Sequence, residues 1–423
     1  MKEFYSLTEV ADMLSVSKET LRRWDKNGSL KPVRHPINNY RVYPSSALKK
    51  FEQLGFLFNK QKARRPKPVK RFTAIELFSG GGGMALGLEK SGLDCVLLND
   101  NDRSACQTLK KNRPNWNIIH GDVAEIDFSS YKGKVDVVAG GFPCQAFSYA
   151  GKKLGFKDAR GTLFYEFARA VNEIRPLICI GENVRGLLNH ANGKTLEGMI
   201  SVLNELGYDV LPPQVLKAIF YRVPQKRERL LIVGLRRGRK LSFEYPTPHG
   251  QTFSLKDALK KGPLFDTEVP KSAGQTYSPR KKAIMKHVPP GGYWRDLSIS
   301  LQKEYMQKSF YLGGGKTGMA RRMHWDEPCL TLTCNPAQKQ TERCHPVETR
   351  PLTVREYARI QTFPDDWEFV GSLSSQYKQI GNAVPVNLAI EIGYSVVDCL
   401  NEYYSRHDAR SLKRQKRKIA EPA

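Results

Sequence analysis

Two short amphipathic segments open the chain. Apolar side chains recur at the spacing of one helix face in residues 7–14, and Ser6 with Glu9 three residues later forms a capping box at their start. A short break follows, and then a second helix is predicted that turns Arg22 and Arg23 outward. Two helices across a short turn are the helix-turn-helix arrangement, and the two arginines are candidate DNA contacts.

A two-stranded wing is predicted after the second helix. Residues 30–34 and 40–43 are strand-like and flank a turn rich in asparagine. The whole segment resembles the MerR-type winged helix, although helix-turn-helix shapes also serve as protein-contact modules. Residues 1–71 hold 17 basic and 6 acidic residues, and this excess favours DNA as the partner.

Short apolar runs then alternate with helical segments up to about residue 235. The runs are residues 72–78, 95–98, 135–139, 177–181 and 230–234. This alternation predicts an α/β fold with a doubly wound, mostly parallel sheet. Ligands of such sheets bind beyond the carboxyl ends of the strands, so we expect the chemically active residues directly after the runs.

A glycine-rich segment follows the first predicted strand. Residues 78–84 contain four consecutive glycines, which allow close approach of a ligand and present amides at a helix start. The run misses the register of the dinucleotide-binding pattern, so it does not identify the cofactor. A cofactor-binding turn is still favoured over a plain tight turn. Asp100 and Asp122 follow the next strands, and together they predict a nucleoside-binding crevice.

A cysteine and a glutamate follow the next two strands. Cys144 lies on a loop shaped by glycine and proline, where a thiolate can act as a nucleophile; an inert buried cysteine is the alternative. Glu182 ends the following strand, and a glutamate in a closed pocket can stay protonated near neutral pH. Residues 221–229 bring cations, including Arg227 and Arg229, toward the same edge.

Composition narrows the class of protein. The chain has 423 residues, 40% of them hydrophobic, and a formal charge of +26, which together favour a globular protein that binds DNA or RNA over an anionic membrane. Its apolar runs are far shorter than a membrane span, so a soluble intracellular protein is expected. The spacing of Cys329, Cys334, Cys344 and His345 matches no common zinc site, so no metal is expected.

Five segments, in this order, resemble the motif series of C5-cytosine DNA methyltransferases of the bacterial restriction-modification type. They are residues 78–83, 142–145, 182–184, 225–229 and 379–385. The resemblance extends from residue 72 to about residue 400. It implies the fold of methyltransferases that use S-adenosylmethionine, with a smaller target-recognition domain beside the catalytic domain.

The resemblance also implies roles for individual residues. Cys144 would add to C6 of a cytosine, Glu182 would bond to its N3 and amine, and Arg227 and Arg229 would act as supporting cations. S-adenosylmethionine would be held by residues of the strand-end loops and the last motif, which are Phe78, Ser79, Gly80, Gly82, Met84, Asp100, Asp122, Val123 and Asn382.

DNA contacts follow from the same family plan. The cytosine must leave the duplex stack, and residues 145–161 form a candidate closing loop. Residues 235–349 would form the target-recognition region, where glutamine and arginine side chains suit base edges or phosphates. The candidate contacts are Gln145, Ser148 and Arg160 in the loop, and Gln338, Gln340 and Arg343 in the recognition region.

The expected domain plan has six parts. They are a MerR-like head at 1–58, a basic linker at 59–71, a catalytic domain at 72–234, a recognition region at 235–349, a returning catalytic part at 350–403 and a frayed basic tail at 404–423. The catalytic part is expected to be monomeric and to be paired in function with a restriction endonuclease. The head is expected to bind the promoter of the enzyme's own gene. The alternatives are a tRNA cytosine-5 methyltransferase, a catalytically idle DNA-binding regulator and, least favoured, an NAD-dependent oxidoreductase.

Overall fold

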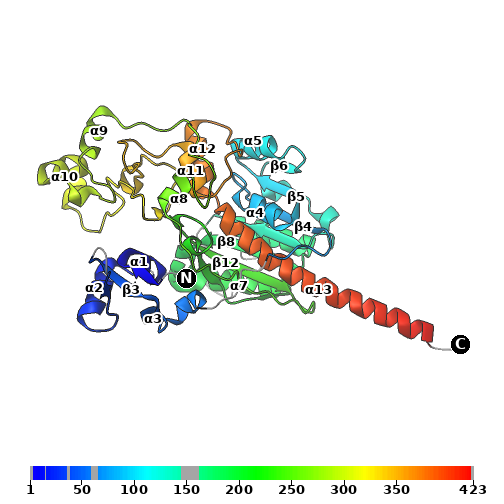
Figure 1. The fold of residues 1–423 in the computed structure, drawn as a ribbon. Coiled ribbons are helices and arrows are strands. Elements are labelled where there is room, and N and C mark those ends of the chain that lie inside the picture. The colour runs from blue at the N-terminus through cyan, green and yellow to red at the C-terminus, as the bar shows by residue number, and fades with distance from the viewer. Residues whose placement is uncertain (1–2, 15, 36–38, 59–64, 144–161, 421–423) are drawn as a thin grey trace.

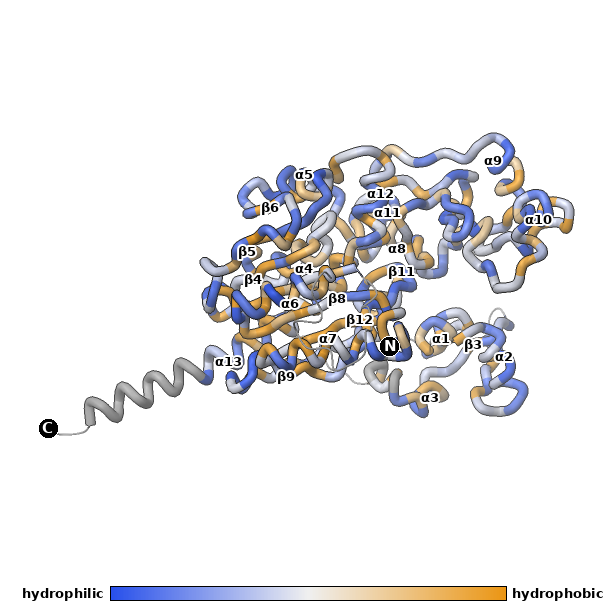
Figure 2. The backbone as a smooth tube through the Cα atoms, turned by 180° about the vertical axis from the view of Figure 1, so that it is seen from behind, coloured by the Kyte–Doolittle hydropathy of each residue, from blue (hydrophilic) through white to orange (hydrophobic). Residues whose placement is uncertain are grey.

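The structure, a computed structural model, describes residues 3–14, 16–35, 39–58, 65–143 and 162–420. Figure 1 shows a central sheet covered by helices, with the small N-terminal unit against one end and a less regular unit beside it. In Figure 2 the apolar segments concentrate in the strands of the sheet and in the helices that cover it. The core of the molecule therefore lies around this sheet.

The N-terminal unit, called the head below, has the predicted helix-turn-helix. Its elements are β1 (Phe4–Ser6), α1 (Leu7–Leu14), α2 (Lys18–Lys26), β2 (Val33–Arg34), β3 (Arg41–Pro44) and α3 (Ser45–Leu48). The capping box is confirmed, because the Glu9 amide donates to Ser6 Oγ at 3.2 Å and the Ser6 amide donates to Glu9 Oε2 at 2.8 Å. The wing is present, and β1 adds a third strand in the order β1-β3-β2.

The central sheet contains eight strands in the order β10-β12-β8-β7-β4-β5-β6, with β9 also paired to β12. The strands are β4 (Phe72–Leu77), β5 (Leu93–Asp100), β6 (Ile118–His120), β7 (Val137–Gly140), β8 (Ile178–Val184), β9 (Tyr208–Val210), β10 (Gln214–Lys217) and β12 (Glu228–Arg236). The predicted mostly parallel sheet is confirmed, since β4 to β8 are parallel. The run at 230–234 departs from this, because β12 is antiparallel to β8, β9 and β10. Antiparallel neighbours need only short connections, which is what links β10 to β12.

Helices α4 (Gly83–Ser91), α5 (Arg103–Asn112), α6 (Leu163–Ile174), α7 (Lys194–Glu205) and α13 (Val386–Ala420) cover the sheet. Helices α4 and α13 lie so close that a Cβ at Gly87 would be 2.2 Å from Ala389 Cβ. The segment Leu373–Arg406 is long and apolar enough for a membrane span, but 67% of its window is buried inside the protein, as in a core helix. Helix α13 also continues through residues 404–420, so the frayed tail expected there is helical instead.

The less regular unit contains α8 (Leu255–Leu259), α9 (Pro279–Met285), α10 (Ile299–Met306), α11 (Val354–Ile360) and α12 (Leu373–Asn382). A two-stranded parallel ribbon of β11 (Gln225–Lys226) and β13 (Cys329–Leu330) joins it to the sheet. The part around α9 and α10 has an apolar cluster of its own, which includes Met285, Trp294 and Met306. The α11 and α12 segment returns to the edge of the sheet, where it completes the site described next.

Candidate active site

A cavity of about 530 Å³ lies at the edge of the sheet where the parallel strands end. Most of the residues predicted for the cofactor and for catalysis line it together, although they come from separate parts of the chain. They are Phe78, Ser79, Gly80, Met84, Asp100, Asp122, Val123, Glu182, Arg229 and Asn382. Gly82 and Arg227, also predicted, are not among the lining residues.

The glycine-rich turn is tied to the end of the second parallel strand. The Gly80 amide donates to Asp100 Oδ2 at 2.8 Å, and the Asp102 amide donates to Asp100 Oδ1 at 2.8 Å. Gly80 and Gly82 have φ angles of +54° and +88°, which glycine adopts without a Cβ clash. Gly82 also lies against Trp367, where a Cβ would be 2.9 Å from Cζ2. These contacts explain why the turn needs glycine and why Gly82 packs rather than lines the cavity.

Two further segments close the cavity. Asp122 precedes a short 3-10 turn, and its carboxylate accepts from the Ala124 amide at 3.0 Å. Helix α12 brings Lys378 to Asp102, with 3.0 Å between Nζ and Oδ2, and places Asn382 at the cavity wall. The last predicted motif therefore does return to the cavity formed by the first strands.

Glu182 and Arg229 form an ion pair in the wall of the cavity. Arg229 Nε lies 2.5 Å from Glu182 Oε1, and both side chains are nearly buried. Burial raises the pKa of Glu182 above its usual value, although the charges of Arg229 and Arg227 work in the opposite direction. A raised pKa favours the protonated carboxyl group, which is the form that can donate a hydrogen bond.

The strand that leads to Cys144 ends directly beside this carboxyl group. Asn183 Nδ2 donates to the Phe142 carbonyl at 2.9 Å, and a Cβ on Gly141 would lie 3.1 Å from Glu182 Oε2. Cys144 itself lies outside the described residues. So do three predicted DNA contacts of the same loop, Gln145, Ser148 and Arg160.

Arg227 has a different environment from Arg229. It is fully buried, and its guanidinium donates to the carbonyls of Gly381, Asn382 and Leu332 at 2.9, 3.3 and 3.3 Å. Its charge reaches Glu182, but its hydrogen bonds join β11, the end of α12 and the segment after β13. Arg227 therefore acts on Glu182 through its charge rather than by contact, and its hydrogen bonds position the segments around the cavity.

Sequence reasoning missed Glu76 as a residue of the cavity. It lies on β4 and is almost fully buried, and Oε2 has no hydrogen-bond partner among the residues that the structure describes. Burial and then the charge of Asp100 raise the pKa of Glu76 well above its usual value. The available signal was a carboxylate inside an apolar strand, directly before the glycine turn.

The predicted DNA contacts divide into exposed and buried residues. Gln338 and Gln340 are exposed, as are Arg22 and Arg23 on α2. Arg343 is buried, and its guanidinium donates to the Thr331 and Glu342 carbonyls. The geometry therefore does not support Arg343 as a base contact, because its donors are used inside the protein.

The cysteines considered as zinc ligands have separate neighbours. Cys334 Sγ contacts Asn382 Oδ1, Cys329 Sγ contacts Met323 Sδ, and Cys344 Sγ contacts the Glu348 carbonyl. Across the described ranges of the chain, no group of three or more His, Cys, Asp or Glu side chains is arranged to hold a metal.

Comparison with known proteins decides the family. Residues 72–398 match the C-5 cytosine-specific DNA methylases. The chain belongs to this family. The protein is thus a DNA cytosine-5 methyltransferase, and S-adenosylmethionine is its methyl donor. Residues 6–43 match the MerR family of regulatory proteins, which confirms the resemblance of the head.

Similar proteins span most of the methyltransferase. Type II methyltransferase M.Eco47II of Escherichia coli is 62% identical and covers 96% of this chain and 98% of its own. Type II methyltransferase M.PspPI of Psychrobacter sp. is 56% identical, with coverages of 94% and 96%. The crystal structure of a putative DNA modification methyltransferase encoded within an E. coli prophage has a TM-score of 0.61 at 24% identity, covers 78% of this chain and 99% of its own, and shows the same fold.

Proposed function

We propose that this methyltransferase modifies C5 of one flipped-out cytosine within a specific short duplex sequence. The methylation would protect host DNA from a cognate restriction endonuclease, as in a type II modification enzyme. The observation that carries the reaction is the Glu182 and Arg229 pair beside the strand end that precedes Cys144. Two relatives that cover almost the whole chain are named type II methyltransferases, which supports the biological setting.

The cavity fits S-adenosylmethionine in size and chemistry. Its volume of about 530 Å³ is in the usual range for a small-molecule site, and its wall combines backbone amides, carboxylates and apolar side chains. Asp100 would bind the ribose, Asp122 and Val123 would flank the adenine, and the turn at Phe78 to Met84 would hold the remainder. When bound, the cofactor supplies an electrophilic methyl group.

Cytosine C5 is a poor nucleophile, and the proposed chemistry overcomes this in two stages. The Cys144 thiolate forms an Sγ–C6 bond, while Glu182 donates to N3 and accepts from the exocyclic amine, which stabilises the electron pair that develops toward C5. That pair would form the bond to the methyl carbon, and the methyl–sulfur bond of the donor would break with its electrons remaining on the sulfur. A base then removes the C5 proton, and the returning electrons expel Cys144 by breaking the Sγ–C6 bond. Arg229 holds the Glu182 carboxyl in place throughout.

The decisive experiment is transfer of tritiated methyl from S-adenosylmethionine to unmethylated plasmid DNA and to tRNA, with bisulfite sequencing of the DNA. We expect label at one short DNA sequence, and its loss in Cys144→Ala. Label in tRNA alone would replace this function with tRNA methylation. Absence of label in both substrates, with DNA binding retained, would indicate an inactive DNA-binding regulator.

The head supports a second proposed role, repression of the gene for the methyltransferase itself. Its match to MerR regulators and the exposed Arg22 and Arg23 on the second helix favour binding to promoter DNA. Deletion of residues 1–58 should raise the output of a reporter driven by that promoter. Unchanged output would remove this role and leave DNA affinity as the function of the head.

A further inference from the structure

The head is fixed to the rest of the methyltransferase by charged contacts of its first two helices. Asp12 of α1 pairs with Lys226 of β11 at 3.0 Å between Oδ1 and Nζ. Lys18, at the start of α2, pairs with Glu327 at 3.0 Å, and Glu327 also lies 3.9 Å from Lys226. The four side chains form an alternating network, which we call the docking cluster. It joins the head to the two sides of the β11 and β13 ribbon.

The docking cluster is partly shielded from water, unlike an ordinary surface ion pair. The side chain of Asp12 is 15% exposed, those of Lys226 and Glu327 are each 24% exposed, and that of Lys18, the outermost, is 44% exposed. Burial raises the pKa of Asp12, whereas Lys18 and Lys226 outweigh the effect of burial at Glu327 and hold its pKa below the usual value. Interactions at such depth are screened less by salt than exposed ones. The head therefore has a defined position.

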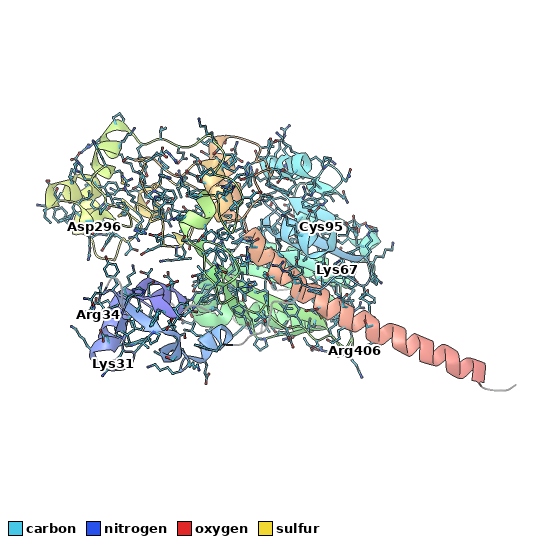
Figure 3. All side chains as sticks on the ribbon, in the orientation of Figure 1. Lys31, Arg34, Lys67, Cys95, Asp296 and Arg406 are labelled. Carbon is cyan, nitrogen blue, oxygen red and sulfur yellow. The ribbon has the colours of Figure 1, made fainter. Side chains whose placement is uncertain are left out.

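Docking through α1 and the first residue of α2 leaves the later part of α2 and the wing exposed. Arg22, Arg23 and Lys26 on α2 face solvent, and so does Arg34 on the wing. In helix-turn-helix proteins the second helix enters the major groove. Figures 1 and 2 show that the head and the α9 and α10 unit lie at the same end of the molecule, and Figure 3 marks Arg34 on the head and Asp296 on that unit.

The boundary between the head and the sheet also connects to the active site. A cavity of about 430 Å³ lies between α1 and strands β11 and β12, and Val184 and Arg229 line both this cavity and the active-site cavity. Its wall carries more basic than acidic side chains, with Arg185, Lys217 and Lys226 on the sheet side. Arg185 is 56% exposed and pairs with Glu228 at 2.9 Å, so an anionic strand that passes this opening would compete with Glu228 for it.

We propose that the head binds the same duplex that the active site methylates, on one flank of the target sequence. The docking cluster fixes the head next to a cavity that shares Val184 and Arg229 with the active-site cavity. In the proposed complex α2 and the wing contact the flanking DNA while the target cytosine lies in the active-site cavity. This inference rests on the proposed function. It assigns to the head a direct part in methylation, which is separate from any effect on transcription.

The proposal predicts that methylation depends on the length of DNA on one side of the target. The substrates are duplexes with the sequence found by bisulfite mapping and about 10 bp, one helical turn, on each side. Adding about 20 bp to one flank should raise kcat/KM at least about tenfold, because the head then binds at high effective concentration. The same addition to the other flank should have little effect. Arg22→Ala with Arg23→Ala should abolish the gain.

Two sets of variants control for charge and for docking. Lys132→Ala with Lys134→Ala removes the same charge from exposed residues just before β7, at the amino ends of the parallel strands, whereas the cavity lies at their carboxyl ends. This variant should keep the flank dependence. Lys18→Glu or Glu327→Lys alone should reduce the gain. The double variant re-forms this ion pair in reverse but loses the attraction between position 327 and Lys226, so it should restore the gain only in part.

Three results would overturn the proposal. They are equal gains from both flanks, a gain retained in the double arginine variant, and stimulation by flanking DNA supplied as a separate duplex. If even the shortest duplex is not methylated, the proposed function itself fails, whatever the head does. Electrophoretic binding of the same duplexes then still decides whether the head contacts one flank.

Discussion

Arg229 Nε lies 2.5 Å from Glu182 Oε1 across two antiparallel strands. Glu182 pairs in register with Leu231, two residues along β12, so Arg229 reaches it diagonally on the same face of the sheet. The contact fixes the carboxyl beside Gly141, where the strand that leads to Cys144 ends. One ion pair thus positions the carboxyl group and opposes the effect of burial on its pKa.

Replacing Arg229 with alanine should lower kcat by about 10²-fold to 10³-fold, the usual effect of losing one preorganised electrostatic group. Arg229 lowers the pKa of Glu182, so its loss should raise that pKa further. Activity that needs protonated Glu182 falls as pH rises through its pKa, and this alkaline decline should move to higher pH in Arg229→Ala. Single-turnover rates of methyl transfer, measured across pH, give the pH at which this decline occurs. The decline should vanish in Glu182→Gln, and an unshifted decline in Arg229→Ala would contradict the assignment.

Glu76 should make the stability of the methyltransferase depend on pH. Burial and Asp100 raise its pKa well above the usual value, so the folded protein holds a proton that the unfolded chain releases above about pH 4.3. The folded state therefore loses stability as pH rises from that value toward the folded pKa. Glu76→Gln should remove this loss and be the more stable protein near neutral pH. Urea unfolding across pH tests it, with exposed Glu125→Gln as the control that should keep the wild-type dependence.

The sequence predicts the strand ends well and the partners of the charged residues poorly. Gly80, Asp100 and Glu182 were found because each directly follows or ends an apolar run, and parallel strands bring such ends to one edge. The hydrogen bonds of Arg227 could not be found in this way. Its acceptors include Gly381 and Leu332, more than a hundred residues away, and which of them it meets depends on how α12 and β13 return to the sheet.

The same limit applies to the head and to Arg343. Helical periodicity and a capping box predict α1, but its pairing with β11 depends on long-range packing that no local pattern encodes. Arg343 looked like a base contact by residue type, since arginine suits guanine edges. Its burial follows from a backbone turn that places Thr331 within reach. Residue type predicts chemistry, whereas exposure decides whether that chemistry is used on a ligand.

Asn183 should support the cysteine loop through one hydrogen bond. Its side chain is buried and donates to the Phe142 carbonyl at 2.9 Å. Asn183→Ala leaves that buried carbonyl without this donor, which should cost about 1–3 kcal/mol of stability. The looser strand end should also lower kcat while the Kd for S-adenosylmethionine stays near the wild-type value. Chemical unfolding and calorimetric cofactor titration check both parts, and a large rise in Kd with unchanged kcat would refute the role.

Two glycines of the cofactor turn should differ in their tolerance of alanine. A Cβ at Gly83 would lie 2.2 Å from the Val384 carbonyl, on the segment that carries Asn382. Gly83→Ala should therefore push this segment away and abolish measurable cofactor binding. Gly80→Ala meets nothing within 4 Å and suffers only from its φ of +54°, a cost of about 1–2 kcal/mol. Cofactor titration and thermal unfolding of both variants test the contrast, which equal losses would contradict.

The exposed glutamines and the buried arginine of the recognition region should separate specificity from stability. Gln338→Ala and Gln340→Ala remove exposed donors and acceptors, and each should relax discrimination at one base position by about 1–3 kcal/mol if it makes a bidentate base contact. Arg343→Ala instead leaves the Thr331 carbonyl without its buried donor and should lower the Tm with the target sequence unchanged. Bisulfite sequencing of plasmid methylated by each variant reads the specificity, and thermal unfolding reads the stability. Relaxed specificity in Arg343→Ala at wild-type Tm would show that this arginine leaves its buried position and reads DNA.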